Sequence, residues 1–323
     1  MYHRLFALLF VTFVAVCKGA SVAKPNCGGT SSSRNIQLLT PANPPRECIY
    51  HIKAYSSYVC QLRIEFAMTL AQPEMPASDN NLAYAECVHD YLQIGHLRLC
   101  GVETKQHVYM PFNRTAGVTS VDLAIVLAHR LDSSGLPKPS WDIKVRQLEC
   151  PSGASVRSLD LDEAPADNAP SMRSSIKDGF FVAPPGCLQY FPHKQGVITT
   201  FNYNRGEGTY PGNMNYAICF RLKRAKLKAV VFNLGAEHLT RNSTMQVDNY
   251  CYSGQVEDYL MIPQSTVKLS KSGSNQFATF FCGQSIDDNT IRSSNPGPLM
   301  MLFNSGTNHK QNVAGFYISF KLQ

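Results

Sequence analysis

The chain has 323 residues, with 30 lysines and arginines against 23 aspartates and glutamates, so its formal net charge is +7 at pH 7. Most of the basic excess lies in the second half, because residues 27–150 hold eleven basic and eleven acidic residues while residues 183–323 hold thirteen and seven. This length suits two domains of ordinary size, each able to bury its own core. No apolar stretch long enough to cross a bilayer follows the N-terminus, so we expect no membrane span.

Residues 1–20 have the layout of a signal peptide. A short basic start is followed by an apolar run over residues 5–16 and by small residues at Gly19 and Ala20. The run is too short to span a bilayer comfortably, so we expect cleavage and a secreted, extracellular protein. Cleavage there removes Cys17 and leaves ten of the eleven cysteines. An even number in an oxidising compartment favours disulfide bonds.

Apolar and polar residues alternate in several stretches, among them residues 62–66, 141–146 and 316–322. This period of two predicts strands with one buried face and one solvent-exposed face. No long stretch has the period of a helix. Short strands between Gly, Pro and Asn turns are typical of antiparallel β-sandwiches. Trp141, the single tryptophan, is in phase with its apolar neighbours, so we expect it in the core.

One cysteine pattern occurs twice. In each copy a cysteine precedes the motif Asp-Tyr-Leu-x-Ile, at residues 90–94 and 258–262, and a Cys-Gly pair follows at residues 100–101 and 282–283. A repeat of this length indicates two domains built on one plan.

The composition between the repeats sets the expected boundaries. Residues 151–182 are rich in proline, serine, alanine and acidic residues and poor in large apolar ones, so we interpret them as a linker. A long covered loop is the alternative. The first domain is then expected at residues 21–150 and the second at residues 183–323.

The first copy resembles a CUB domain. The resemblance rests on Cys27-Gly-Gly, the aromatic residue after Cys48, Cys-x-x-Asp-Tyr-Leu-x-Ile at residues 87–94, and Cys100-Gly101. CUB domains are extracellular β-sandwiches, and the whole chain is similar to two-domain arthropod CUB proteins. We therefore expect an all-β fold of two tandem, disulfide-linked antiparallel β-sandwiches of the CUB-like jelly-roll type. The second copy departs from the pattern, because Asp258 stands seven residues after its cysteine instead of three. It is expected to be a divergent CUB-like domain.

The resemblance also implies a disulfide pairing, first cysteine with second and third with fourth in each domain. The implied pairs are Cys27–Cys48, Cys87–Cys100, Cys187–Cys219 and Cys251–Cys282. The remaining Cys60 and Cys150 both lack a counterpart in the second copy, so we expect a fifth bridge between them. Cys60 is in phase with the inward-facing residues of its strand, whereas Cys150 is out of phase with those of its own strand. Either a β-bulge shifts the phase or the last strand ends near Gln147.

Many CUB domains bind calcium through the aspartate of the Asp-Tyr motif and an aspartate in a late loop. This resemblance makes Asp90 and Asp132 the candidate calcium ligands of the first domain, since carboxylates on neighbouring loops suit a hard cation. The alternative is that Asp90 caps a strand or turn through its own hydrogen bonds. No other cofactor is expected, and in the second domain Asn304 replaces the late aspartate.

Residues 221–228 form a basic stripe. It consists of Arg221, Lys223, Arg224, Lys226 and Lys228. Such a stripe favours an anionic glycan or an acidic extracellular protein as partner. The alternative is a solvated strand edge whose lysines protect against aggregation. Nucleic acid is not expected as a partner of a secreted protein. Asn113 and Asn242 stand in Asn-x-Thr motifs that predict glycosylation.

The sequence contains no catalytic motif: Gly-x-Ser-x-Gly, His-Glu-x-x-His, phosphate-binding loops and dinucleotide fingerprints are all missing. His89 and Asp90 are adjacent, and neighbours on a strand point to opposite faces. We therefore expect a non-enzymatic module for extracellular protein or glycan interaction or adhesion. The alternatives are a structural matrix component, whose low-complexity repeats are missing here, and a non-catalytic regulator of a secreted protease.

Overall fold

The computed structural model describes residues 21–75, 84–112, 117–130, 135–150, 178–221, 230–238, 245–248, 251, 258–268, 274–285, 290–294, 299–306 and 314–323. The expected signal peptide and residues 151–177 of the expected linker lie outside these ranges. No helix within these ranges has the length and apolar character needed to cross a bilayer.

The first unit is a sandwich of two sheets. One sheet has the order β1-β3-β8-β5-β6, with β1 at Thr30–Ser31, β3 at Glu47–Lys53, β8 at Ser120–Val126, β5 at Tyr91–Ile94 and β6 at Leu97–Leu99. The other has the order β2-β9-β4-β7, with β2 at Asn35–Leu39, β9 at Ser140–Glu149, β4 at Val59–Thr69 and β7 at Val102–Pro111. Among the described strands, β1 and β3 of this unit pair in parallel.

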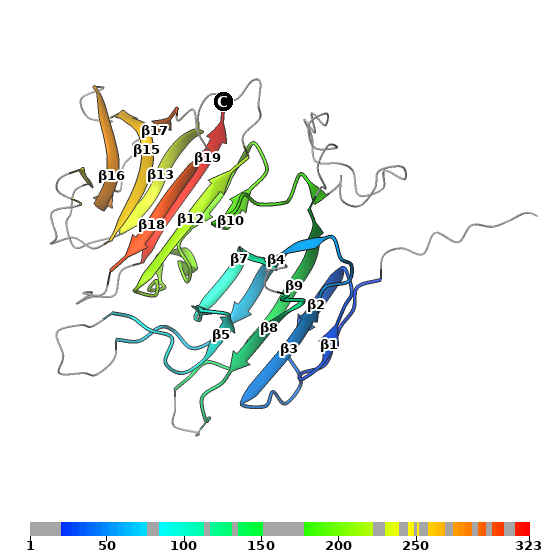
Figure 1. The fold of residues 1–323 in the computed structure, drawn as a ribbon. Coiled ribbons are helices and arrows are strands. Elements are labelled where there is room, and N and C mark those ends of the chain that lie inside the picture. The colour runs from blue at the N-terminus through cyan, green and yellow to red at the C-terminus, as the bar shows by residue number, and fades with distance from the viewer. Residues whose placement is uncertain are drawn as a thin grey trace, which may run out of the picture.

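The second unit has ten strands in a single hydrogen-bonded sheet. Eight of them follow the order β10-β12-β18-β15-β16-β13-β19-β11, with β10 at Cys187–Phe191, β12 at Met214–Phe220, β18 at Met300–Ser305, β15 at Tyr259–Lys268, β16 at Asn275–Ser285, β13 at Val230–His238, β19 at Gly315–Leu322 and β11 at Gln195–Thr199. Strand β14 (Met245–Val247) pairs with β16, and β17 (Thr290–Ser293) pairs with β13 and β15. Strands β10 and β12 also pair in parallel. A short 3-10 helix, η3 (Asn204–Gly206), follows β11. Figure 1 shows the first unit from blue to green and the second from light green to red.

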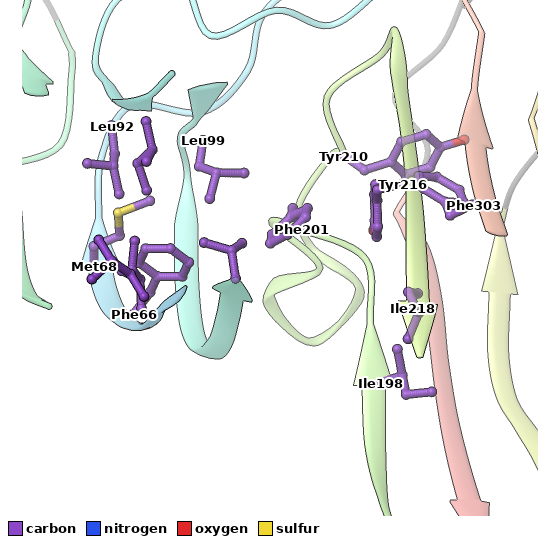
Figure 2. Close-up of a cluster of buried hydrophobic side chains, with 14 of the residues drawn as sticks. Phe66, Met68, Leu92, Leu99, Ile198, Phe201, Tyr210, Tyr216, Ile218 and Phe303 are labelled. Carbon is purple, nitrogen blue, oxygen red and sulfur yellow. The ribbon is translucent and has the colours of Figure 1, made fainter. Parts of the chain in front are cut away.

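The expected alternation is confirmed in both units. Leu62 and Ile64 of β4 and Ile143 of β9 are fully buried, and Trp141 is buried beside them, as predicted. Figure 2 shows the apolar side chains of the two units as two groups, with the ring of Phe201 between them. The apolar core therefore continues across the contact between the units.

Five disulfides join the cysteines as Cys27–Cys48, Cys60–Cys150, Cys87–Cys100, Cys187–Cys219 and Cys251–Cys282. These are the pairs expected from the sequence. The pairing of β4 with β9 shifts register between Val59 and Gln61, which places a bulge at Cys60, and β9 continues to Glu149. Of the two explanations for the phase mismatch, the structure therefore shows the bulge. The all-β, disulfide-rich fold expected from the sequence is confirmed.

Candidate functional site

The two units meet along a buried polar seam, where β7 lies against β10 (Figure 1) and against the residues that follow β11. Gln106 of β7 reaches across this seam. Its Nε2 lies 3.0 Å from the carbonyl oxygens of both Thr199 and Thr200, and its Oε1 accepts a 2.9 Å hydrogen bond from Gln189. A buried amide left without partners is costly, so these bonds favour one relative position of the two units.

Asn202 is a second hydrogen-bonding residue of the seam and is fully buried. Its side-chain Oδ1 accepts a 2.8 Å hydrogen bond from the backbone N–H of Val102. Its backbone N–H donates to Oε1 of Glu103 at 2.9 Å. Its Nδ2 donates to Gln72 at 2.6 Å and to the Thr209 carbonyl at 2.7 Å. One side chain of the second unit thus binds backbone and side-chain groups of the first.

Gly101 permits this close approach. A Cβ atom at this position would lie 2.2 Å from Oδ1 of Asn202, and the residue has φ +79°. Any other side chain would displace Asn202 and strain the backbone. The glycine of the Cys100-Gly101 pair therefore serves the contact between the units.

Two titratable groups are buried in the seam, and burial favours the neutral form of each. Burial raises the pKa of Glu103 well above its ordinary value, although the hydrogen bond from the Asn202 backbone N–H to Oε1 acts in the opposite direction. The other carboxyl oxygen, Oε2, has no partner among the described residues. Burial, and then the charge of Arg63, lower the pKa of His107 to about 3. Its neutral ring places Nε2 3.0 Å from the Tyr190 carbonyl oxygen.

The end of the expected linker is part of the same contact. Asp178 is fully buried and accepts hydrogen bonds from Arg34 at 2.6 Å and from Arg146 at 3.0 Å, both in the first unit. The amide of Gln61 exchanges two hydrogen bonds with the Ala183 backbone, at 2.8 and 2.9 Å. From Asp178 onward the chain is therefore tied to the first sandwich.

A cleft of about 1030 Å³ opens at one end of the seam. Residues of both units line it: Val102, Thr104, Lys105 and Gln106 from β7, and Phe191, Val197, Thr199, Tyr203, Asn204, Arg205, Glu207 and Tyr317 from the second unit. Because residues of both units form the walls of this cleft, it is our candidate functional site. Mixed polar and aromatic walls with a few charges are common in binding sites.

Comparison with known families assigns the second unit. Residues 184–323 match the family model described as Animal CUB domain. The second unit therefore carries a similarity to animal CUB domains. The match does not extend to residues 21–150, although the first copy carries the motifs on which the sequence resemblance rests. The arthropod type and the presence of two CUB domains therefore stay predictions. No curated protein matches the chain in sequence.

Several solved structures are similar to the chain at low identity. The CUB1-EGF-CUB2 domains of rat MASP-1 are 12% identical with a TM-score of 0.27, covering 93% of this chain and all of that one. The CUB1-EGF-CUB2 domain of human MASP-1/3 is 12% identical with a TM-score of 0.26, covering 90% and 100%. The extracellular domain of ANXUR1 from Arabidopsis thaliana is 9% identical with a TM-score of 0.23, covering 91% and 90%. Likeness at this level carries no argument about function.

The surroundings of Asp90 do not fit a calcium ion. Its two carboxylate oxygens accept hydrogen bonds from the Arg130 guanidinium at 2.9 and 2.5 Å, from the Ala128 amide at 3.0 Å and from the Ala71 amide at 3.1 Å. Burial alone would raise the pKa of Asp90, but these bonds outweigh it and hold the pKa below its usual value. The guanidinium supplies the positive charge beside Asp90, and oxygens so engaged are not available as ligands.

The other sequence-predicted site residues are mostly outside the described ranges. Asp132, the glycosylation motifs at Asn113 and Asn242, and the stripe residues Lys223, Arg224, Lys226 and Lys228 all lie there, and the predictions for them stay predictions. Arg221 is described, and its guanidinium lies over the Phe180 ring, 4.3 Å from the ring centre. His89 pairs with Glu74 at 3.1 Å on the surface, and no group of three His, Cys, Asp or Glu side chains in the described ranges is arranged to hold a metal.

Sequence reasoning missed the seam and the cleft. Gln106, His107 and Asn202 are single polar residues in or beside strands, and nothing in their local pattern distinguishes them from solvent-facing positions. The one available signal was Gly101, since a glycine directly after a strand-linking cysteine often marks a close approach of another segment.

We expect Glu103→Gln to change how stability depends on pH. In the wild-type protein the unfolded carboxyl ionises above its ordinary pKa of 4.5, while the buried one stays protonated. Between pH 4.5 and the raised pKa of the folded protein, the wild-type free energy of unfolding should therefore fall by up to about 1.4 kcal/mol for each pH unit. Glutamine keeps the oxygen that accepts from Asn202 and cannot ionise, so the variant should be more stable above neutrality. Denaturant unfolding at several pH values measures this, with the exposed Glu47→Gln as control. Equal slopes for wild type and Glu103→Gln would contradict the assignment.

Proposed function

We propose that this chain is a secreted, non-catalytic extracellular binding protein that engages its partner at the cleft between its two units. CUB domains are a family of extracellular interaction modules, and residues 184–323 match that family. The five disulfides agree with an oxidising compartment. The sequence has no catalytic motif, which favours binding over catalysis.

The cleft carries this proposal. It is built from both units, and the seam of hydrogen bonds beneath it holds its walls in place before any ligand arrives. A preorganised site avoids the entropic cost of ordering on binding. A protein whose two modules served only as spacers in a matrix would need no such buried polar seam.

Blocking the cleft tests the proposal. Thr104 is exposed and lines the cleft, so Thr104→Trp should fill part of it without disturbing the core. Ser120→Trp, at an exposed residue at the start of β8, is the matched control. Full-length wild type and Ser120→Trp should capture the same partner from the native extracellular fluid, identified by mass spectrometry, and Thr104→Trp should lose it. Capture of the same partner by all three forms would refute the cleft as the binding site.

A further inference from the structure

Two basic residues face the cleft from opposite units, and both adopt left-handed backbone conformations. Lys105 has φ 63°, and it is the extra residue of a β-bulge, since Thr104 pairs with Ala67 and Gln106 with Phe66. Arg205 has φ 60° inside η3. Such conformations are unfavourable for residues other than glycine, and bulges re-aim side chains next to functional sites.

Neither cation is neutralised by a group in the described ranges. No hydrogen bond or ion pair in the described part of the chain engages the Lys105 ammonium or the Arg205 guanidinium, and both residues are exposed. A smaller hollow of about 300 Å³ shares Thr104 and Lys105 with the cleft and adds the exposed Lys144. Three cations without an ion pair among the described residues therefore line the cleft and the hollow beside it, and their charge attracts an anionic ligand.

Acidic residues interrupt these cations. Glu207 lines the cleft, and Asp142 lines the smaller hollow, where it accepts a 2.9 Å hydrogen bond from Gln37. The hollow's other charges, Arg63 and Glu65, form an ion pair with each other. A dense polyanion would be repelled by these carboxylates. A ligand with isolated negative groups separated by hydroxyls fits better, because hydroxyls can donate to the carboxylates.

The walls also offer aromatic surface. Tyr203 and the 40% exposed Tyr317 lie with their ring centres 6.0 Å apart, and Val197 is 44% exposed beside them. Thr199 and Asn204 add polar groups to the same walls. Sugar rings present apolar C–H faces to aromatic rings and hydroxyls at their edges, so this combination suits a saccharide more than a peptide side chain.

We propose that the cleft binds an acidic oligosaccharide with spaced carboxylate or sulfate groups. Lys105 and Arg205 hold the acidic groups, and the tyrosine pair contacts a sugar ring. This inference rests on the proposed binding function of the cleft. It uses other residues than the basic stripe at residues 221–228.

Calorimetric titration of the full-length protein tests the proposal. The probe is an octasaccharide of alternating glucuronate and N-acetylglucosamine, and a neutral oligomer of N-acetylglucosamine is the control ligand. Binding is expected for the acidic probe alone. Lys105→Gln combined with Arg205→Gln should weaken it roughly tenfold or more, since charge-assisted hydrogen bonds are lost. The thermal midpoint should be unchanged, because neither side chain has a partner among the residues that the structure describes.

Two further variants separate this site from its rivals. Tyr317→Ala should weaken binding, while glutamine at Lys223, Arg224, Lys226 and Lys228 together should leave it unchanged. Loss of binding in that stripe variant, or full binding by the Lys105 and Arg205 variant, would overturn the proposal. Binding of a polyglutamate peptide but not of the octasaccharide would also overturn it in favour of an acidic peptide. If Thr104→Trp abolishes partner capture while the acidic octasaccharide does not bind, the ligand class is wrong and the cleft function stands.

Discussion

Replacing Arg130 by glutamine is expected to lower the free energy of unfolding by about 3–5 kcal/mol. The guanidinium donates to both oxygens of Asp90, whose side chain is fully buried, while that of Arg130 is 29% exposed. Its removal leaves a buried carboxylate with only the amides of Ala71 and Ala128 as donors. Breaking one partner of a buried pair costs much more than the pair itself contributes. Chemical denaturation monitored by Trp141 fluorescence measures the loss.

A double variant isolates the cause. Asp90→Asn combined with Arg130→Gln removes the buried charge as well, so it should recover part of the stability that Arg130→Gln loses. Arg98→Gln, which removes an exposed guanidinium lying over the Tyr91 ring, should cost under about 1 kcal/mol. If Arg130→Gln and Arg98→Gln lowered the free energy of unfolding by the same small amount, the ion pair between Asp90 and Arg130 would not be important for stability.

Calcium supplies a second readout of the same site. Because the guanidinium already binds Asp90, the thermal midpoint of the wild-type protein should not respond to added calcium or to a chelator. A midpoint that rose with millimolar calcium would show that the carboxylate releases Arg130 to bind the metal.

Replacing Cys60 and Cys150 together by serine is expected to cost roughly 4–5 kcal/mol of stability. Their bridge spans 90 residues of sequence, the longest separation among the five disulfides. It joins the start of β4 to the residue after β9, and so ties together two neighbouring strands of one sheet. In the chain-entropy model, a longer closed loop restricts the unfolded chain more. Urea unfolding of the oxidised variant measures the loss.

The pairing itself can be checked in the secreted protein. Peptide mapping without reduction should recover the Cys60 and Cys150 peptides joined and no free thiol. The Cys87–Cys100 bridge spans 13 residues, so its removal should cost less through chain entropy. Recovery of alkylated Cys60 from the native protein would rule out the bridge.

The sequence alone determined the fold class and the cysteine pairs. Alternation with a period of two is a local property of a strand, and it placed Leu62, Ile64, Trp141 and Ile143 inside correctly because one face of each strand must leave water. The cysteine pattern repeats along the chain, so a family resemblance and a simple comparison of the two copies were enough to pair the cysteines. These inferences need no knowledge of how distant segments pack.

Only the tertiary structure decided the partner of Asp90 and the existence of the cleft. Arg130 stands 40 residues from Asp90, and Asn202 contacts Val102 across 100 residues. The identity of a buried polar partner depends on which loops the packed sheets bring together, and no local period records that. A carboxylate such as that of Asp90 can bind either a metal ion or an arginine. Which of the two it binds depends on the cation that the folded chain places beside it.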